Sequence, residues 1–313
     1  ATDEGKGHTT ERRWKFVPYR PYPPVGEGFV RLLFSMRDSF FTMHHSFFIT
    51  SGGDLVITIL FLGDVVGQPG CEAVRRFLPR FKKEHQVDVV IANGENSAVG
   101  NGILPQSADH LLDSGVDVIT TGNHVFRRRE IYPYLEAHPG QIIRPANYPS
   151  SAPGAGYTVY DGGRFRLGII NLMGVVFMEA LDNPFHTVDG ILPKLEDCNA
   201  VLVDFHAEAT GEKRAMGFYL DGRVTAVIGT HTHVQTADEQ ILPQGTAYLT
   251  DAGMVGPQHS VLGVKPEAVL KRHLTHMPSR FDTADGPCRI QGLLLNVEVK
   301  SGKVNKVTRV NLV

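Results

Sequence analysis

The stretch VITILFLGD, residues 56–64, is an almost unbroken apolar run that ends in a glycine and an aspartate. The run is rich in β-branched residues and too short to cross a membrane, which predicts a buried strand. After Pro69, the apolar residues Val74, Leu78 and Phe81 recur at the spacing of one face of a helix. A buried strand followed by an amphipathic helix predicts the first unit of an α/β fold.

The same alternation continues along the chain. The runs VDVVIANGEN (87–96) and DVITTGNH (117–124) read as further strands that end in polar loops, and helices are predicted over 105–114 and 128–137. This order predicts parallel strands with helices on the faces of the sheet. Later apolar runs predict strands at 164–172, 200–206, 223–229, 245–251, 289–299 and 303–312. The short turn between the last two strands indicates an antiparallel hairpin and a mixed second sheet.

Composition limits the classes of protein that fit. The chain has 313 residues, of which 42% are hydrophobic, and 31 Lys and Arg against 33 Asp and Glu give a net charge of −2. Such a chain can bury a sizeable core, which excludes disorder over most of its length. A nearly neutral balance also argues against a general attraction to nucleic acid or to anionic lipid.

The chain changes character near Gly52 and Gly53. Before them, prolines and aromatic residues cluster without a lasting helical or strand period. We therefore predict an N-terminal extension over residues 1–54 and one domain over residues 55–313. The extension is open to three interpretations: an artefact of the start site, a flexible tail, or a segment that docks on a partner.

Three widely separated cysteines, Cys71, Cys198 and Cys288, form no CxxC pair and no even disulfide framework. This pattern favours a reducing cytoplasm. No segment reads as a membrane span, because the apolar stretch 29–50 contains Arg31, Arg37 and Asp38. No signal peptide is expected either, since the first residues are polar and mixed in charge.

Residues that can bind a metal stand where successive predicted strands end. In α/β sheets, ligands bind beyond the carboxyl ends of the strands, so these side chains are expected to converge. Carboxylates, carboxamides and imidazoles together suit a divalent transition metal, and their number suits two ions that share a carboxylate. In an extended segment, two histidines spaced two apart would point to the same side. The residues are Asp64, Glu95, Asn96, Asn123, His124, His206, His231 and His233.

Five motifs carry a resemblance to a known family: GDVVGQPG, NGEN, TGNH, DFHAEATGEK and GTHTHVQTAD. Over about residues 57–313 the chain resembles the YmdB-like metallophosphoesterases of the calcineurin-like phosphoesterase superfamily. The resemblance implies an α/β fold in which two packed mixed β-sheets are flanked by helices, in four α/β/β/α layers. It also implies a metal-dependent phosphoric diester hydrolase that acts on cyclic nucleotides, most of all 2′,3′-cyclic nucleotides, by attack of a metal-bridging hydroxide.

The resemblance further implies a role for each residue. Asp64, Glu95, Asn96 and His233 would ligate one metal ion, and Glu95, Asn123, His206 and His231 would ligate the second. His124 would be the catalytic acid. The cofactors would be two divalent ions, iron by family resemblance, with manganese and zinc as alternatives that the ligands also accept. The chain departs from the wider superfamily at Val66, where a histidine is usual, and from the family at Arg127, where an acidic residue is usual.

Several alternatives remain open at this stage. A cyclic mononucleotide, an RNA end with a cyclic phosphate and a small phosphomonoester all suit such a site, and a homo-oligomer without membrane contact is expected. A serine esterase of the SGNH type would need a serine after Asp64, where Val65 stands. A metal-bound regulatory or scaffold protein with weak hydrolysis is the alternative from a different class.

Overall fold

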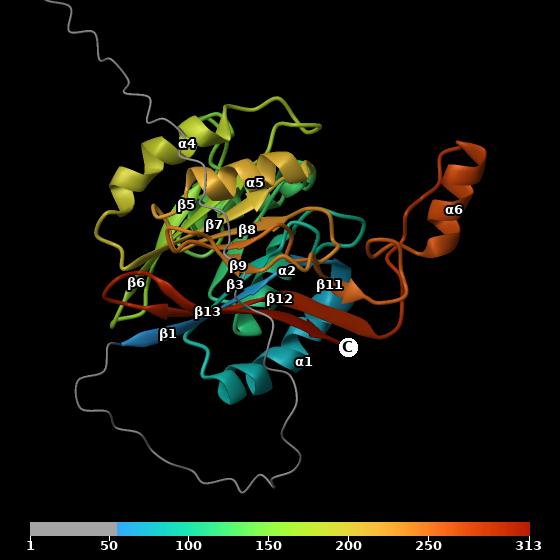
Figure 1. Cartoon of the computed structure of the whole chain (residues 1–313). Helices are drawn as coiled ribbons and strands as arrows, with labels where there is room; N and C mark the ends of the chain where they lie inside the picture. Colours follow the sequence, from blue (N-terminus) through green and yellow to red (C-terminus); the bar gives the residue numbers. More distant parts are fainter. Residues whose placement is uncertain (1–54) are drawn as a thin grey trace, which may run out of the picture. The chain divides into compact units, whose positions relative to one another are not determined.

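Two mixed β-sheets face each other in the computed structural model, which describes residues 55–313 (Figure 1). The predicted extension, residues 1–54, lies outside the described residues. The boundary between residues 54 and 55 therefore stays a prediction.

The first sheet has seven strands and contains the strand that opens the domain. Its order is β2-β11-β12-β1-β3-β4, and β13 pairs with β12. β1 is parallel to β3, β3 is parallel to β4, and β12 is antiparallel to both β1 and β13. The strands are β1 (Val56–Leu62), β2 (Asp64–Val65), β3 (Val89–Asn93), β4 (Val118–Thr120), β11 (Met254–Pro257), β12 (Cys288–Glu298) and β13 (Val304–Leu312).

The second sheet has six strands in the order β5-β6-β7-β8-β10-β9. The strands β6, β7, β8 and β10 run parallel, and the edge strands β5 and β9 are antiparallel to their neighbours. Both sheets are thus mixed. The strands are β5 (Tyr157–Asp161), β6 (Arg166–Met173), β7 (Ala200–His206), β8 (Ala226–Thr230), β9 (Gln240–Ile241) and β10 (Ala247–Leu249).

The hairpin predicted at the end of the chain forms, but it belongs to the first sheet. β12 pairs with β1 and β11 along one side and with β13 along the other, and the pairing of Val56 with Glu298 continues to Leu62 opposite Gly292. A hairpin needs an open edge, and β1 offers one because its parallel neighbour β3 occupies only its other side. The sequence predicts the hairpin itself. Which sheet the hairpin joins depends on the long-range pairing of β12 with β1.

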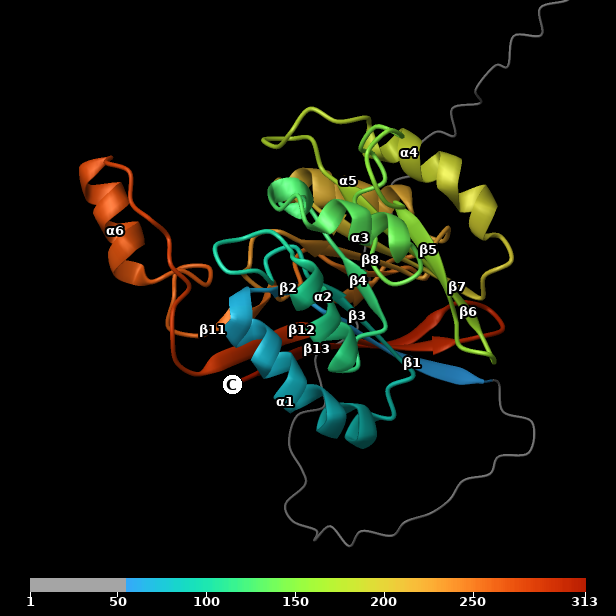
Figure 2. The same ribbon diagram turned by 180° about the vertical axis from the view of Figure 1, so that it is seen from behind.

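Helices cover the outer faces of both sheets (Figures 1 and 2). Apolar side chains of α1 (Gly67–His85), α2 (Pro105–Asp113) and α3 (Ile131–Ala137) pack with the first sheet. Those of α4 (Pro184–Ile191) and α5 (Thr210–Tyr219) pack with the second sheet. Within residues 55–313, no helix combines the length and the apolar character that a membrane crossing requires.

The helix predicted over 128–137 begins later than expected. The 3₁₀ helix η1 (Val125–Arg127) comes first, and Arg128 after it has an extended backbone. The Arg128 guanidinium donates hydrogen bonds to the carbonyl oxygens of Val99 and Asn101, at 2.5 and 3.2 Å. The extended backbone of Arg128 interrupts the helical conformation, and α3 begins only at Ile131. Another 3₁₀ helix, η2 (Leu192–Leu195), follows α4, and α6 (Pro266–Thr275) stands apart from the layers in both views (Figures 1 and 2).

β1 explains why the opening run lacks alternation. Its residues Ile57, Ile59 and Phe61 enter the core between the two sheets, while Leu60 and Leu62 pack under α1. Because both faces of β1 are covered, both sets of alternate side chains must be apolar. The predicted layered arrangement therefore follows from the first strand onward.

We predict that Phe61→Ala destabilises the protein by about 3–5 kcal/mol, because Phe61 is fully buried between the sheets. The control Phe177→Ala removes a ring that is 89% exposed and should change the free energy of unfolding by less than about 0.5 kcal/mol. Urea unfolding of the two variants measures the difference. Equal effects would contradict the assignment of Phe61 to the core.

Candidate metal centre

Five loops meet at the carboxyl ends of the strands. β1 leads through Gly63 into Asp64, β3 leads into Glu95 and Asn96, and β4 leads into Asn123 and His124. In the second sheet, β7 ends at His206, and β8 is followed directly by His231. The convergence of the predicted side chains is therefore produced by strands from both sheets.

Glu95 lies at the middle of the cluster and is fully buried. Its Oε1 accepts a hydrogen bond from Asn96 Nδ2 at 3.0 Å and lies 3.3 Å from His206 Nε2. Its Oε2 accepts the backbone N–H of His124 at 2.9 Å. The carboxylate thus contacts residues from the ends of β3, β4 and β7.

One side of the cluster is formed by Asp64, Asn96 and His233. His233 Nε2 lies 3.2 Å from Asn96 Nδ2 and 3.7 Å from Asp64 Oδ1. The other side is formed by Asn123, His206 and His231. His206 Nε2 lies 2.9 Å from Asn123 Oδ1 and 3.1 Å from His231 Nδ1. All predicted ligands therefore lie together, in two groups with Glu95 between them.

His124 stands at the rim of the cluster. Its side chain is 23% exposed, and its Nδ1 lies 2.8 Å from Asn96 Oδ1 and 3.2 Å from Glu95 Oε1. A proton on Nδ1 would be donated to these oxygens, which leaves Nε2 as the ring nitrogen for another partner. The imidazole is thus held by the cluster through one nitrogen only.

The loop of His231 and His233 is not extended, so the prediction for this loop was wrong in its geometry. His231 has a φ of 104° and His233 a φ of 62°, both in the left-handed region. Such values are strained for histidine and persist only where surrounding contacts enforce them. The two imidazoles face the cluster because of this bent backbone, and not because of strand alternation.

A buried ion pair behind the loop supplies these contacts. Lys213 Nζ lies 2.7 Å from Asp251 Oδ2, and both side chains are only 1% exposed. Lys213 also donates to the carbonyl oxygen of Thr230 at 2.7 Å, and Asp251 accepts the N–H of Thr232 at 3.1 Å. The N–H of His231 donates to Asp64 Oδ2 at 3.1 Å. The backbone at Thr230, His231 and Thr232 is therefore tied to charged groups.

Two glycines beside the site allow neighbouring groups to lie close to the backbone. A Cβ on Gly122 would lie 2.3 Å from His206 Cδ2 and 2.4 Å from Glu95 Oε2. A Cβ on Gly229 would lie 1.8 Å from the carbonyl oxygen of Thr250. Neither glycine has a positive φ. These two glycines are therefore needed because they lack a side chain, and not because of a left-handed backbone.

Sequence reasoning missed the buried polar residues that hydrogen-bond to one another next to the cluster. Asp204 is fully buried and accepts hydrogen bonds from Thr120 and Thr230 at 2.5 and 2.7 Å, and from Asn93 at 3.0 Å. Thr230 in turn lies 2.9 Å from His206 Nδ1. The one sequence signal was a charged residue inside an apolar strand, two positions before His206.

Electrostatics in the cluster distinguish the ionisable groups. Burial raises the pKa of Asp64, because the charged form loses its hydration. Burial opposes ionisation of Glu95 as well, but the imidazoles of His206 and His124 outweigh it and hold the pKa of Glu95 well below its usual range. Burial and the charge of His206 lower the pKa of His231 to about 3. His231 is thus neutral at pH 7, the form that coordinates metals.

The residues present fit divalent cations. Asp64 Oδ1 is buried and has no hydrogen-bond partner among residues 55–313, so an acceptor is left for a cation. Ligand atoms of Glu95, His206 and His231 all lie within 4.8 Å of one another. Burial would lower the pKa of His206, but Glu95 outweighs it and raises that pKa to about 9, and a bound cation would replace this proton. Asn96 would present its oxygen to a cation after a half-turn of its amide.

A cavity of about 210 Å³ adjoins the cluster. Val66, at the position where the wider superfamily has a histidine, contributes an apolar surface to it. His124 and His233 line the same cavity together with Leu262 and Phe281. The cavity therefore brings apolar surface next to the rim of the cluster.

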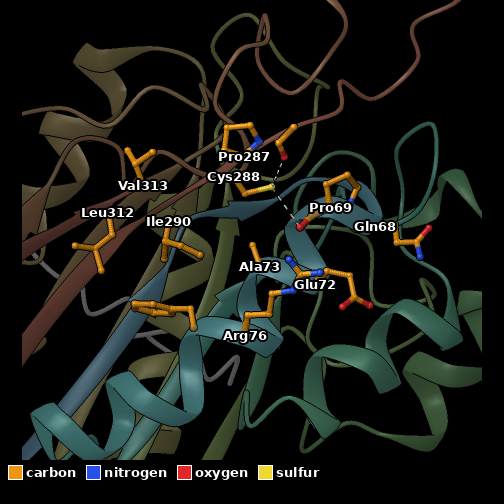
Figure 3. Close-up of a pocket in the computed structure, with 12 residues that line it drawn as sticks. Gln68, Pro69, Glu72, Ala73, Arg76, Pro287, Cys288, Ile290, Leu312 and Val313 are labelled. Atoms are coloured by element: carbon orange, nitrogen blue, oxygen red, sulfur yellow. Dashed lines mark hydrogen bonds between the residues drawn. The ribbon is translucent and has the colours of Figure 1, made fainter.

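A larger cavity, of about 740 Å³, lies between α1 and the ends of β12 and β13 (Figure 3). Figure 3 shows Glu72 and Arg76 on its α1 side and Leu312 and Val313 on the other side. The thiol of Cys288 donates to the carbonyl oxygen of Pro69 at 3.4 Å. None of the clustered residues at the strand ends lines this cavity.

Comparison with known proteins agrees with the motifs. The family model described as YmdB-like protein matches residues 60–310. This chain belongs to that family. A 2′,3′-cyclic-nucleotide 2′-phosphodiesterase of Bacillus subtilis (strain 168) is 43% identical over 253 residues, which cover 80% of this chain and 96% of the relative. The predicted membership of the YmdB-like family is therefore confirmed.

Solved structures place the YmdB-like chain in the expected fold. A protein from Thermus thermophilus has a TM-score of 0.78 and 42% identity and covers 82% of this chain and 99% of its own. A phosphatase from Mycoplasma pneumoniae has a TM-score of 0.78 and 34% identity, over 83% and 94%. An NAD nucleotidase of Haemophilus influenzae, at 14% identity and a TM-score of 0.54 over 83% and 57%, shares the fold alone. The predicted metallophosphoesterase fold is confirmed.

We predict that Lys213→Met destabilises the protein by about 3–5 kcal/mol, because Asp251 is left as an unpaired buried charge. Chemical unfolding of the metal-free protein measures this effect. Arg80→Met is the control, since it breaks the exposed pair of Arg80 with Glu84 and should barely move the unfolding midpoint. Similar midpoints for both variants would contradict the role given to the buried pair.

Proposed function

We propose that this protein is a dinuclear metal-dependent phosphodiesterase that hydrolyses cyclic nucleotides, with 2′,3′-cyclic nucleotides as its preferred substrates. The observation that carries the proposal is the buried Glu95 between two groups of ligands at the strand ends. The predicted enzyme class, a phosphoric diester hydrolase, is confirmed by the similarity to the Bacillus subtilis phosphodiesterase. The substrate and the dinuclear mechanism are the further steps that we propose.

In this proposal, each group of side chains holds one ion. Asp64, Asn96 and His233 bind the first ion, and Asn123, His206 and His231 bind the second. Glu95 binds both, which its contacts with Asn96 on one side and with His206 on the other support. Only two of the seven ligands are carboxylates, so two divalent cations leave the site with a net positive charge that attracts a phosphodiester anion.

The residues then divide the chemistry. When bound, two divalent ions lower the pKa of a coordinated water and neutralise charge on the phosphoryl oxygens. His124 protonates the leaving oxygen of the ester as a general acid. Its Nδ1 lies 3.2 Å from Glu95 Oε1, and His124 lines the adjoining cavity, which leaves Nε2 for a substrate. The carboxylate of Glu95 also stabilises the protonated imidazole.

The adjoining cavity supports a small substrate. Its lining by Val66, Leu262 and Phe281 offers apolar surface beside the ligand cluster, which suits the base of one nucleotide. A nucleotide at an RNA end that carries a cyclic phosphate offers the same chemistry, and a small phosphomonoester would also fit. The assay described below distinguishes between these substrates.

The identity of the metal as iron, the homo-oligomeric state and the cytoplasmic location stay predictions. The serine esterase alternative lacks its nucleophile, since Val65 follows Asp64 and is buried in β2. The regulatory or scaffold alternative would require that the biological effect of the protein does not depend on Glu95.

We predict that His124→Ala keeps its metal and loses about 10²- to 10⁴-fold in kcat, because the general acid is removed. The backbone N–H of residue 124 still donates to Glu95, so the carboxylate keeps this partner. Elemental analysis and steady-state kinetics on a cyclic nucleotide measure the two effects. His273→Ala on the exposed helix α6 is the control and should be unchanged. Wild-type turnover by His124→Ala would contradict the assignment.

A substrate panel tests the proposed function directly. We expect the metal-loaded protein to hydrolyse 2′,3′-cyclic mononucleotides faster than RNA ends with a cyclic phosphate, 3′,5′-cyclic nucleotides, model aryl phosphodiesters and aryl phosphomonoesters. Chelation should abolish activity on all of them. Elemental analysis of the same preparation identifies the metal. Activity that survives chelation, or that resides only in phosphomonoester cleavage, would overturn the proposal.

A further inference from the structure

We propose that Glu208 is a positioning residue that orients the imidazole of His231 toward the metal centre. This inference rests on the proposed function, because it takes His231 to be a metal ligand. The segment DFHAEATGEK supplies His206 to the cluster and Lys213 to the buried ion pair behind it. Glu208 lies between these two residues in the sequence, and none of the roles described above includes it.

The two nitrogens of His231 face different partners. Nδ1 lies 3.1 Å from His206 Nε2, inside the cluster. Nε2 lies 3.1 Å from Glu208 Oε2, outside it. A carboxylate offers acceptors only, so this close contact favours the tautomer in which Nε2 carries the proton and Nδ1 presents its lone pair. Glu208 therefore selects the form of His231 that can bind a metal through Nδ1.

The other two histidines of the cluster show the same arrangement with different partners. His206 directs Nε2 into the cluster and places Nδ1 2.9 Å from Thr230 Oγ1. His233 directs Nε2 toward Asp64 and places Nδ1 3.1 Å from the carbonyl oxygen of Leu262. Each imidazole thus has an outer partner, and among the three partners only Glu208 is charged.

His231 needs such a partner because its backbone contacts leave the ring free. The N–H of His231 and the neighbouring N–H of Thr232 are bound by Asp64 and Asp251. These bonds fix the main chain, but they do not fix the rotation of the ring about its side-chain bonds. The contact with Glu208 supplies that second constraint, and the charge of the carboxylate increases the basicity of Nδ1.

The test is the affinity of the metal-free protein for Mn²⁺. Loss of an outer carboxylate partner of a metal-binding histidine typically weakens metal binding by about 10- to 100-fold. We expect Glu208→Ala to weaken the binding of one of two Mn²⁺ ions by this factor and to leave the other ion nearly unaffected. Glu208→Gln should recover part of the loss, because its amide oxygen still accepts the proton of His231. Calorimetry measures both affinities.

Two controls keep the result interpretable. Glu136→Gln changes an exposed carboxylate on α3 and should bind Mn²⁺ like the wild type. The side chain of Glu208 is 50% exposed, so its variants should keep the unfolding midpoint of the wild type. Wild-type affinity for both ions in Glu208→Ala, or an equal loss in Glu136→Gln, would overturn the inference. A wild-type protein that binds fewer than two ions would instead overturn the proposed function.

Discussion

A buried carboxylate between two groups of mostly neutral ligands is the constraint on which the site depends. Glu95 is fully removed from solvent, and a charge in that position needs compensation from its surroundings. The imidazoles of His206 and His124 supply part of it and hold the pKa of Glu95 low, although burial acts in the opposite direction. In the proposed holoenzyme, two cations supply the rest. The fold serves this purpose by directing strand ends from both sheets to one carboxylate.

The layered fold could be predicted because its determinants are local. Alternating apolar runs and amphipathic helices give the α/β order, and the double-sided burial of β1 explains why Ile57 and Leu60 are both apolar. The convergence of the predicted ligand side chains could be predicted as well, because each side chain stands where a strand ends and the ends of parallel strands share one edge. The hairpin of β12 and β13 was predicted as a unit, but its place beside β1 depends on pairing between residues more than 200 positions apart.

What the sequence did not reveal concerns contacts between loops. The pair of Lys213 and Asp251 holds the loop of His231 and His233 in its bent conformation. The prediction that both imidazoles point to one side assumed an extended segment instead. Lys213 and Glu208 belong to the DFHAEATGEK motif. Their closeness to His206 in the sequence indicated that they lie near the site, but it did not show which residues they contact. Their partners become visible only when α5 and the loop after β8 are placed together.

The central claim is that seven side chains hold two ions with Glu95 between them. Anomalous diffraction from crystals of the protein loaded with Mn²⁺ tests it most directly. The account predicts two peaks about 3.5–4 Å apart, one against Asp64, Asn96 and His233 and the other against Asn123, His206 and His231. A single peak, or two peaks that do not share Glu95, would contradict it.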